Sequence, residues 1–404
     1  MKRILIVSGA ALSRNPRVVK EAGALAESGH AVTVLTLRNH PAAEEHDREL
    51  LAGARFSRIT LDVAPVPGAP VLPVFWRRAR SSLARRLARW TGRSSIETIG
   101  PGGELLRVAR RQTADLVIGH TELGLWVAAQ LLAEGRKIAA DFEDWHSEDL
   151  PPADRVGRPV RLLAEVERAL LRDASYTTTT SLALARALHQ QGGGKEPAVV
   201  TNSFPLQPDF RPGSPGSRPA FFWFSQTLGP GRGLEEFLAA WQMTKAPGRL
   251  VVLGEDRAGY RESLLATLPS SRRTAVQFLD LVPPARLPSL IAQHDVGLAL
   301  ESSATRSRDL TITNKILQYL NAGLAVVATP TAGQREVLSH DATAGLLVDF
   351  RAPAAAARQL DILIGERAAL AASQRAARRL AETVYCWEKE APKLLSLVGA
   401  ALQS

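Results

Sequence analysis

The segment from Thr311 to Leu338, TITNKILQYLNAGLAVVATPTAGQREVL, decides the fold class. Its polar lead-in enters a short stretch in which Ile316, Leu317 and Leu320 share one face of a helix. The stretch ends at a glycine and gives way to the apolar run AVVATP and a second turn that contains a glycine. A short strand that is apolar on both faces and lies between helices is typical of a parallel sheet covered by helices.

The same alternation runs along almost the whole chain of 404 residues. The first half predicts seven strands, at 3–9, 31–37, 57–63, 114–120, 137–144, 174–181 and 197–203. The second half predicts six, at 220–226, 249–255, 275–280, 295–301, 325–330 and 345–350. We therefore predict an α/β protein with two Rossmann-like, doubly wound domains that face each other across a cleft, followed by a helical tail.

The boundary between the two series is a stretch rich in Pro, Gly and Ser, TNSFPLQPDFRPGSPGSRPA at 201–220. We predict a first domain at 1–203, a linker at 204–219 and a second domain at 220–375. Residues 376–404 predict a C-terminal helix that packs back on the first domain. Ligands of such sheets lie at the carboxyl ends of the strands, so the candidate site residues are sought there.

Composition limits the functions to consider. Hydrophobic residues make up 45% and charged residues 22% of the chain, as in soluble globular proteins. The lone cysteine, Cys386, excludes an internal disulfide. The apolar run in MKRILIVSGAAL is too short for a membrane span and continues as a strand and helix, which disfavours a signal peptide. We therefore expect a cytoplasmic protein.

The positive charge is concentrated in one segment. The net charge is +10, and residues 74–93, VFWRRARSSLARRLARWTGR, hold seven arginines and no acid, which leaves 10 − 7 = +3 elsewhere. Apolar residues recur near the helical period at Phe75, Ala79, Leu83, Leu87 and Trp90, with arginines on the other faces. The segment is either an interfacial helix on an anionic membrane surface or a solvated helix packed on its own domain. We expect no nucleic-acid partner, because no aromatic and basic residues interleave as in an RNA-binding module.

The residues Thr313, Asn314 and Lys315 predict an anion site at the start of the helix that opens this section. Thr313 is in the N-cap position, and Lys315 shares a face with Gln318. A helix N-terminus favours an anion, and a lysine there adds a full charge. The alternative is a solvated surface lysine.

Two further loops have the same chemistry. After the strand 220–226, which ends at Gln226, the loop TLGPGRGLEEFL places Gly231 and Arg232 just before a helix, as suits a diphosphate. After the strand 325–330, Gly333 permits a tight turn, and Glu336 lies in the first turn of the next helix. The alternatives are a flexible turn with an exposed arginine and a carboxylate that favours its own helix dipole. Neither GxGxxG nor GxxxxGK[ST] is present.

Together these pieces resemble the GT-B glycosyltransferases, and specifically glycosyltransferase family 4, over nearly the whole chain. The resemblance rests on SRNPRVVKEAGALAESGHAVTVLT, ADLVIGH, GPGRGLEEFL, VQFLDLVPPARLPSLIAQHDVGLAL and NKILQYLNAGLAVVATPTAGQREVL, in this order. It implies a nucleotide-diphosphate sugar as donor, clamped at its diphosphate by Arg232 and Lys315. Gln226 stands where the family often has a second arginine, Val282 would meet the nucleobase, and Glu336 the ribose or sugar.

The chain departs from the paired glutamates of that family. The second glutamate falls on Gln318, and the first on or near Leu310, beside Asp309. Asn314-Lys315 is similar to divergent members that lack the pair. Gln318 would hydrogen-bond a ribose hydroxyl less strongly than a carboxylate does.

The resemblance also implies an acceptor side in the first domain and a retaining, metal-independent transfer to an unknown hydroxyl, with no cofactor. His120 would lie by the donor sugar or be a core histidine. Glu143 and Asp144 would orient the acceptor or act as base, or cap a helix. The other residues expected on the acceptor side are Gly9, Asn15 and Arg17. The rivals are a GT-B nucleotide-sugar epimerase and an inactive sugar-nucleotide-binding homologue.

Overall fold

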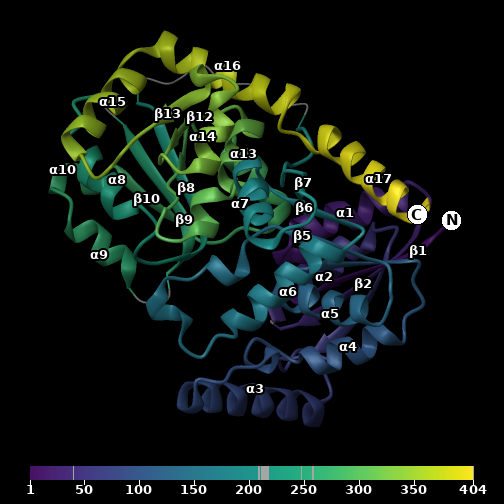
Figure 1. The fold of residues 1–404 in the computed structure, drawn as a ribbon. Coiled ribbons are helices and arrows are strands. Elements are labelled where there is room, and N and C mark those ends of the chain that lie inside the picture. Colours follow the sequence, from purple (N-terminus) through teal and green to yellow (C-terminus); the bar gives the residue numbers. More distant parts are fainter. Residues whose placement is uncertain (40, 208–209, 211–217, 247, 257–258, 404) are drawn as a thin grey trace. The chain divides into compact units, whose positions relative to one another are not determined.

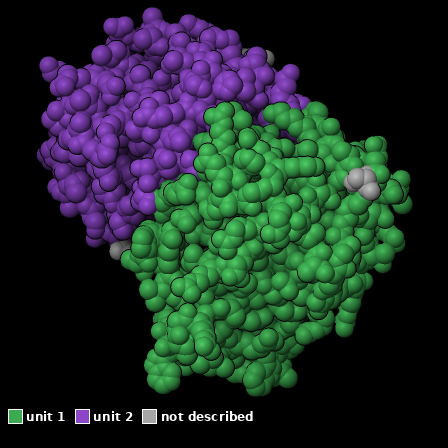
Figure 2. All heavy atoms as spheres, in the orientation of Figure 1, with its two compact units in different colours: residues 1–200, 305–307, 391–404 green, residues 201–304, 308–390 purple. Residues whose placement is uncertain are grey.

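The computed structural model describes residues 1–39, 41–207, 210, 218–246, 248–256 and 259–403 (Figure 1). The predicted linker at 204–219 therefore lies largely outside the described residues. The chain divides into two compact units (Figure 2). Unit 1 comprises Met1–Val200, Thr305–Ser307 and Ala391–Ser404, and unit 2 comprises Thr201–Ala304 and Arg308–Glu390.

Unit 1 is built on a 7-stranded parallel sheet in the order β3-β2-β1-β4-β5-β6-β7. All of the strands predicted in the first half are present, and most of them are buried between helices, whereas the two edge strands, at 57–62 and 198–199, are half-buried. The strands are β1 (Arg3–Ser8), β2 (Ala31–Arg38), β3 (Ser57–Asp62), β4 (Leu116–His120), β5 (Ile138–Phe142), β6 (Tyr176–Thr179) and β7 (Ala198–Val199). The helices are α1 (Pro16–Glu27), α2 (Pro41–Ala52), α3 (Val71–Thr91), α4 (Gly102–Arg110), α5 (Thr121–Ala133), α6 (Val160–Asp173) and α7 (Leu182–Gly192).

Helix α5 packs directly on β1 because residue 124 is a glycine. A Cβ atom on Gly124 would lie 2.1 Å from the carbonyl oxygen of Val7, which no side chain tolerates. This close approach brings the start of α5 next to the carboxyl end of β1, where the predicted acceptor side lies.

Unit 2 contains a 6-stranded parallel sheet in the order β10-β9-β8-β11-β12-β13. The predicted strands are again all present, and β8 extends to Leu228 through an irregularity between Phe224 and Thr227. The strands are β8 (Ala220–Leu228), β9 (Arg249–Asp256), β10 (Val276–Leu279), β11 (Val296–Ala299), β12 (Ala325–Ala328) and β13 (Gly345–Leu347). The helices are α8 (Leu234–Trp241), α9 (Tyr260–Ala266), α10 (Ser270–Arg273), α11 (Leu287–Ile291), α12 (Arg306–Leu310), α13 (Asn314–Ala322) and α14 (Ala332–Ser339).

The C-terminal tail is helical, but it is not the single helix predicted from residue 376 onward. It consists of α15 (Pro353–Gly365), α16 (Arg367–Thr383) and α17 (Trp387–Gln403). The break falls at Tyr385 and Cys386, which are both buried. Turning the chain here buries the Tyr385 ring in the core of unit 2. In the part of the chain that the structure describes, no helix is long and apolar enough to cross a bilayer.

Candidate functional site

Lys315 lies in the first turn of α13 and is held by a carboxylate. Its Nζ lies 2.7 Å from Oε1 of Glu301, and both side chains are largely buried, with 17% and 13% exposed. Nζ also lies 5.7 Å from the centre of the Trp223 ring, within the range of a cation–π contact. Lys315 is therefore not the freely solvated lysine of the alternative interpretation. Its ammonium group still has more N–H donors than the bond to Glu301 uses.

The sequence analysis did not single out Glu301. This residue follows β11, and its backbone is fixed by Thr329, which follows β12. The Glu301 N–H donates to the Thr329 hydroxyl at 2.8 Å, and that hydroxyl donates to the Glu301 carbonyl at 2.6 Å. The feature of the sequence that could have identified Glu301 was its position at the carboxyl end of a buried strand. Gln318, on which the sequence analysis places the second family glutamate, is half-buried on α13.

Thr313 occupies the N-cap position of α13, as predicted, but its side chain makes no capping bond. Its hydroxyl is buried and has no hydrogen-bond partner among the described residues. A buried hydroxyl without a hydrogen-bond partner is energetically unfavourable. The Thr313 hydroxyl at the start of α13 is therefore available to hydrogen-bond a ligand beside Lys315. Asn314, the first residue of the helix, is half-buried.

The loop before α8 presents Arg232. Gly231 and Gly233 have φ angles of 71° and 81°, in the left-handed region that favours glycine. Nη1 of Arg232 donates to the Ser225 hydroxyl at 2.7 Å, and the rest of the side chain is exposed. Gln226 is also exposed, but it lies in the irregular part of β8 rather than at its end.

The start of α14 differs from the prediction. The helix begins at Ala332, because the Thr331 hydroxyl and the Asp309 carboxylate accept its first N–H groups, each at 3.3 Å. Glu336 therefore lies beyond the first turn. Gly333 is inside the helix rather than in a tight turn, and its role is packing. A Cβ atom there would lie 2.2 Å from the carbonyl oxygen of Thr311.

A cavity of about 390 Å³ lies at the carboxyl ends of β9 and β10. It is lined by Glu255, Asp256, Arg261, Asp280 and Leu281. The neighbouring residue Val282 is half-buried and packs against the core of unit 2. The guanidinium of Arg261 is fixed by Asp280 at 2.8 Å and by the Gly254 carbonyl at 3.0 Å.

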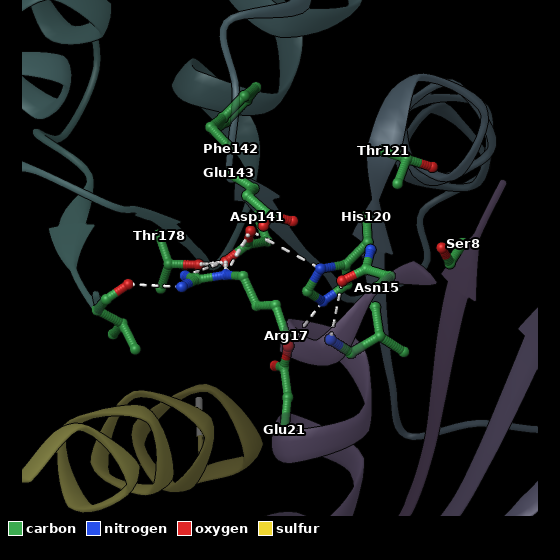
Figure 3. A network of polar contacts seen from close by, with 12 residues as sticks. Ser8, Asn15, Arg17, Glu21, His120, Thr121, Asp141, Phe142, Glu143 and Thr178 are labelled. Carbon is green, nitrogen blue, oxygen red and sulfur yellow. Dashed lines mark hydrogen bonds and ion pairs between the residues drawn. The ribbon is translucent and has the colours of Figure 1, made fainter. Parts of the chain in front are cut away.

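In unit 1, Arg17 and Asp141 form a buried ion pair at the carboxyl ends of the strands (Figure 3). Nε and Nη2 of Arg17 bind the carboxylate at 2.9 and 2.5 Å, and Nη1 donates to the Val200 carbonyl at 2.6 Å. The Thr178 hydroxyl donates to Asp141 at 2.5 Å. Although burial opposes it, Arg17 lowers the pKa of Asp141 below its ordinary value. Arg17 thus fastens α1 to the ends of β5, β6 and β7.

His120 points into the same network (Figure 3). Its Nε2 lies 2.6 Å from Oε2 of Glu21, its Nδ1 lies 3.7 Å from Oδ1 of Asp141, and 1% of the side chain is exposed. Burial alone would lower the pKa of His120, but Glu21 and Asp141 raise it above its ordinary value. Glu143, just after β5, has its pKa raised by burial.

The remaining acceptor-side candidates surround the same strand ends. The Asn15 side chain accepts the Val18 N–H at 3.2 Å and so caps α1. Gly9 donates its N–H to the Thr121 hydroxyl at 2.8 Å. Thr121 has a φ of 61°, a strained conformation for a β-branched residue. Asp144 is half-buried in the loop after β5.

His120 should give unit 1 a pH-dependent stability. Because its folded pKa lies above the ordinary value of about 6.5, its contribution is complete below that pH and is lost as pH rises through the folded pKa. Thermal unfolding from pH 6 to 9 should show a decline in Tm that is weaker in His120→Gln. The exposed residue His189 provides the control, His189→Gln. An equal decline in His120→Gln and the wild type would contradict this assignment.

Among the described residues, no group of three or more His, Cys, Asp or Glu side chains is arranged to hold a metal ion. The acid-rich segment FEDWHSED at 142–149 lies within the described residues and forms no such group.

Comparisons with known proteins identify both halves of the chain. Residues 15–202 match the model of the glycosyl transferase 4-like domain, and residues 218–366 match that of the glycosyl transferases group 1. No curated protein sequence matches the chain.

Solved structures share the fold at low identity. HepE from Anabaena, in complex with UDP and glucose, is 16% identical, with a TM-score of 0.70 and 99% of this chain and 100% of that chain covered. Sucrose-phosphate synthase from Thermosynechococcus elongatus is 16% identical, with a TM-score of 0.71 and 99% and 98% covered. WaaG, a glycosyltransferase involved in lipopolysaccharide biosynthesis, is 15% identical, with a TM-score of 0.61 and 97% and 99% covered. These similarities confirm the predicted GT-B fold.

Proposed function

Because the chain belongs to the glycosyltransferases, with a glycosyl transferase 4-like domain followed by a glycosyl transferases group 1 domain, we propose that it moves a sugar from a nucleotide-diphosphate donor to an acceptor hydroxyl. The observation that supports the donor site is the ion pair of Lys315 with Glu301 at the N-terminus of α13. The complexes of HepE with UDP and with UDP-glucose support a uridine nucleotide as the first candidate.

In this proposal unit 2 stabilises the leaving group. As the bond from the anomeric carbon to the diphosphate oxygen breaks, negative charge grows on the diphosphate. Lys315, Arg232, the Thr313 hydroxyl and the first N–H groups of α13 would receive that charge. Glu301 would keep the ammonium group of Lys315 in place. The backbone N–H groups of Asn314 and of the loop at Gly231 would donate to the diphosphate as well.

The other donor contacts are assigned by position. The cavity between the ends of β9 and β10 would take the nucleobase, with Leu281 and Val282 along one side. Gln318, Gln226, Gly333 and Glu336 remain candidates for the ribose and sugar.

In unit 1, we assign the acceptor side to the carboxyl ends of β1, β4 and β5. Asp144 and Glu143 would orient the acceptor hydroxyl or take its proton, and His120 would lie by the donor sugar. Gly9 and Asn15 would shape the floor of the acceptor side, and Arg17 would support it through Asp141. We further propose that the transfer retains the anomeric configuration, needs no metal or cofactor, and takes place in the cytoplasm.

A thermal-shift screen tests the donor assignment. The ligands tested are UDP, ADP, GDP, CDP and dTDP, each alone and as its glucose conjugate, and we expect one of them to raise Tm clearly more than the others. A ligand at 100 times its Kd raises the free energy of unfolding by about 2.7 kcal/mol. This ligand should raise the Tm of the wild type and of Lys245→Ala equally, and it should raise the Tm of Lys315→Ala less. If no nucleotide raised the Tm of the wild type, the proposal would be refuted. Release of free nucleoside diphosphate without an acceptor would favour the epimerase.

Chelation tests the metal assignment separately. Activity should be unchanged by EDTA, since arginine, lysine and a helix N-terminus supply the positive charge. Loss of activity in EDTA that a divalent cation restores would refute metal-independent transfer. Proton NMR of the product's anomeric centre would decide between retention and inversion.

A further inference from the structure

Helix α3 exposes its large apolar side chains, whereas a helix that packs only on its own domain normally buries them. The face it buries consists of small residues, Val74, Ser81 and Ala88. On the opposite side a stripe of large apolar residues is 48% to 91% exposed: Leu72, Trp76, Leu83, Leu87 and Trp90. At about 100° per residue these five side chains fall within about 60° of one another. We call this set the apolar stripe.

The charge beside the stripe indicates what covers it. Arg77 is bound to Glu104 at 2.8 Å, and Arg80 lies 3.7 Å from Glu97 and 3.9 Å from Glu104. Arg85 donates weakly to the Thr98 carbonyl at 3.4 Å. Arg78, Arg86 and Arg89 have no recorded ion pair with any described residue. An exposed apolar stripe with tryptophans, on a helix that carries three unpaired arginines and no acid of its own, fits the headgroup region of an anionic bilayer.

An apolar groove of about 770 Å³ continues this surface at the N-terminal half of α3. Its walls include Pro65, Val66, Val71, Val74 and Phe75, and Arg78 contributes to its lining. The walls are mainly hydrocarbon, and the guanidinium offers a partner for a phosphate.

The groove begins, in sequence, shortly after the chain leaves the carboxyl edge of the sheet, where the acceptor side is assigned. Its first residues follow the carboxyl end of β3, and β3 is parallel to β2 and β1. With strands about 4.8 Å apart, the end of β3 lies about 10 Å from the end of β1. Figure 1 shows α3 at the outer edge of unit 1, beyond α4 and away from the β1–β7 sheet.

We propose that α3 docks unit 1 on an anionic lipid bilayer, with the groove receiving the hydrocarbon chain of one lipid. Resting on the proposed glycosyl transfer, this names the acceptor class: a hydroxyl on the polar end of an anionic membrane lipid. The apolar stripe enters the headgroup region, the unpaired arginines bind lipid phosphates, and Arg78 binds the phosphate of the lipid in the groove.

Co-sedimentation of the full chain with vesicles tests the docking. Wild type should pellet with phosphatidylglycerol–phosphatidylcholine vesicles, and less in high salt or with phosphatidylcholine alone. The variant Trp76→Ser/Leu83→Ser/Trp90→Ser should lower the bound fraction about tenfold or more. The control Val156→Ser/Ile362→Ser, at sites 70% and 66% exposed, should bind as wild type does. No wild-type pelleting would overturn the proposal, as would self-association that the stripe variant abolishes.

Dodecyl phosphate below its micellar concentration tests the groove. It should bind wild type, whereas butyl phosphate should not. Ala79→Trp should fill the groove and abolish dodecyl phosphate binding while vesicle binding persists. Ser82→Trp is a second filling variant if Ala79→Trp fails to fold. Equal binding by wild type and both folded variants would overturn the groove assignment. None of these assays needs a nucleotide, so their failure is distinguishable from failure of the donor assignment.

Discussion

Replacing Lys315 with alanine is expected to lower kcat/KM for glycosyl transfer about a hundredfold. A hydrogen bond to a charged group contributes about 1.5–3 kcal/mol, and each 1.4 kcal/mol is a factor of about ten. The loss should lie at the upper end, because Glu301 would remain as an unpaired carboxylate, 13% exposed, close to the departing diphosphate. The measurement is kcat/KM with the donor that the nucleotide screen identifies.

The partner residue makes this prediction specific. Glu301→Gln keeps the Lys315 charge and should cost less than Lys315→Ala. The double variant Lys315→Ala/Glu301→Gln should recover part of the loss, because the unpaired carboxylate is gone. Lys245→Ala, at an exposed lysine of the same unit, should leave kcat/KM unchanged. If Lys315→Ala kept wild-type kcat/KM and nucleotide affinity, the diphosphate would have to bind elsewhere.

Arg17→Met is expected to be the most destabilising change in unit 1. It would leave the Asp141 carboxylate buried without its cation, and breaking a buried ion pair costs about 3–5 kcal/mol. In a unit of this size that corresponds to a fall in Tm on the order of 10 °C. Differential scanning fluorimetry at pH 7 measures it.

A second substitution separates charge from packing. Arg17→Met/Asp141→Leu removes both charges and should recover most of the lost Tm, since paired apolar replacements of buried ion pairs are often neutral. Arg172→Met breaks the pair with Asp173, where both side chains are largely exposed, and should change Tm very little. A double variant no more stable than Arg17→Met would show that the loss was one of packing.

Most strand positions could be predicted because a buried parallel strand is usually apolar on both faces, a pattern that the local sequence displays. Strand β6 is an exception, since it is buried although threonines make up most of it. The start of α13 and the glycine loop before α8 were predictable for the same local reason. Glu301 was not, because its partner Lys315 meets it only when the end of β11 and the start of α13 come together. Gly333 was predicted as a turn residue, yet it serves close packing on Thr311, a contact between segments that the sequence does not display. The start of α14 was misplaced because Asp309, on another helix, helps to fix it.

The sequence predicted a helix at 74–93, either interfacial or packed on its own domain, but not which residues face outward. Phe75 and Ala79 fit the helical period, yet they line the groove, whereas Leu72 and Trp76 complete the apolar stripe. The direction a helix faces depends on its packing partners, so the period alone could not supply it.

Both ends of the chain belong to unit 1, since Met1–Val200 and Ala391–Ser404 are parts of the same compact unit. In connectivity, unit 2 is therefore inserted between the two long pieces of unit 1, and only the short piece Thr305–Ser307 of unit 1 interrupts it. A force applied between the termini in an optical trap would load unit 1 first. Unit 2 would be shielded from tension until the C-terminal part of α17 had peeled away, so the two units should rupture in a fixed order.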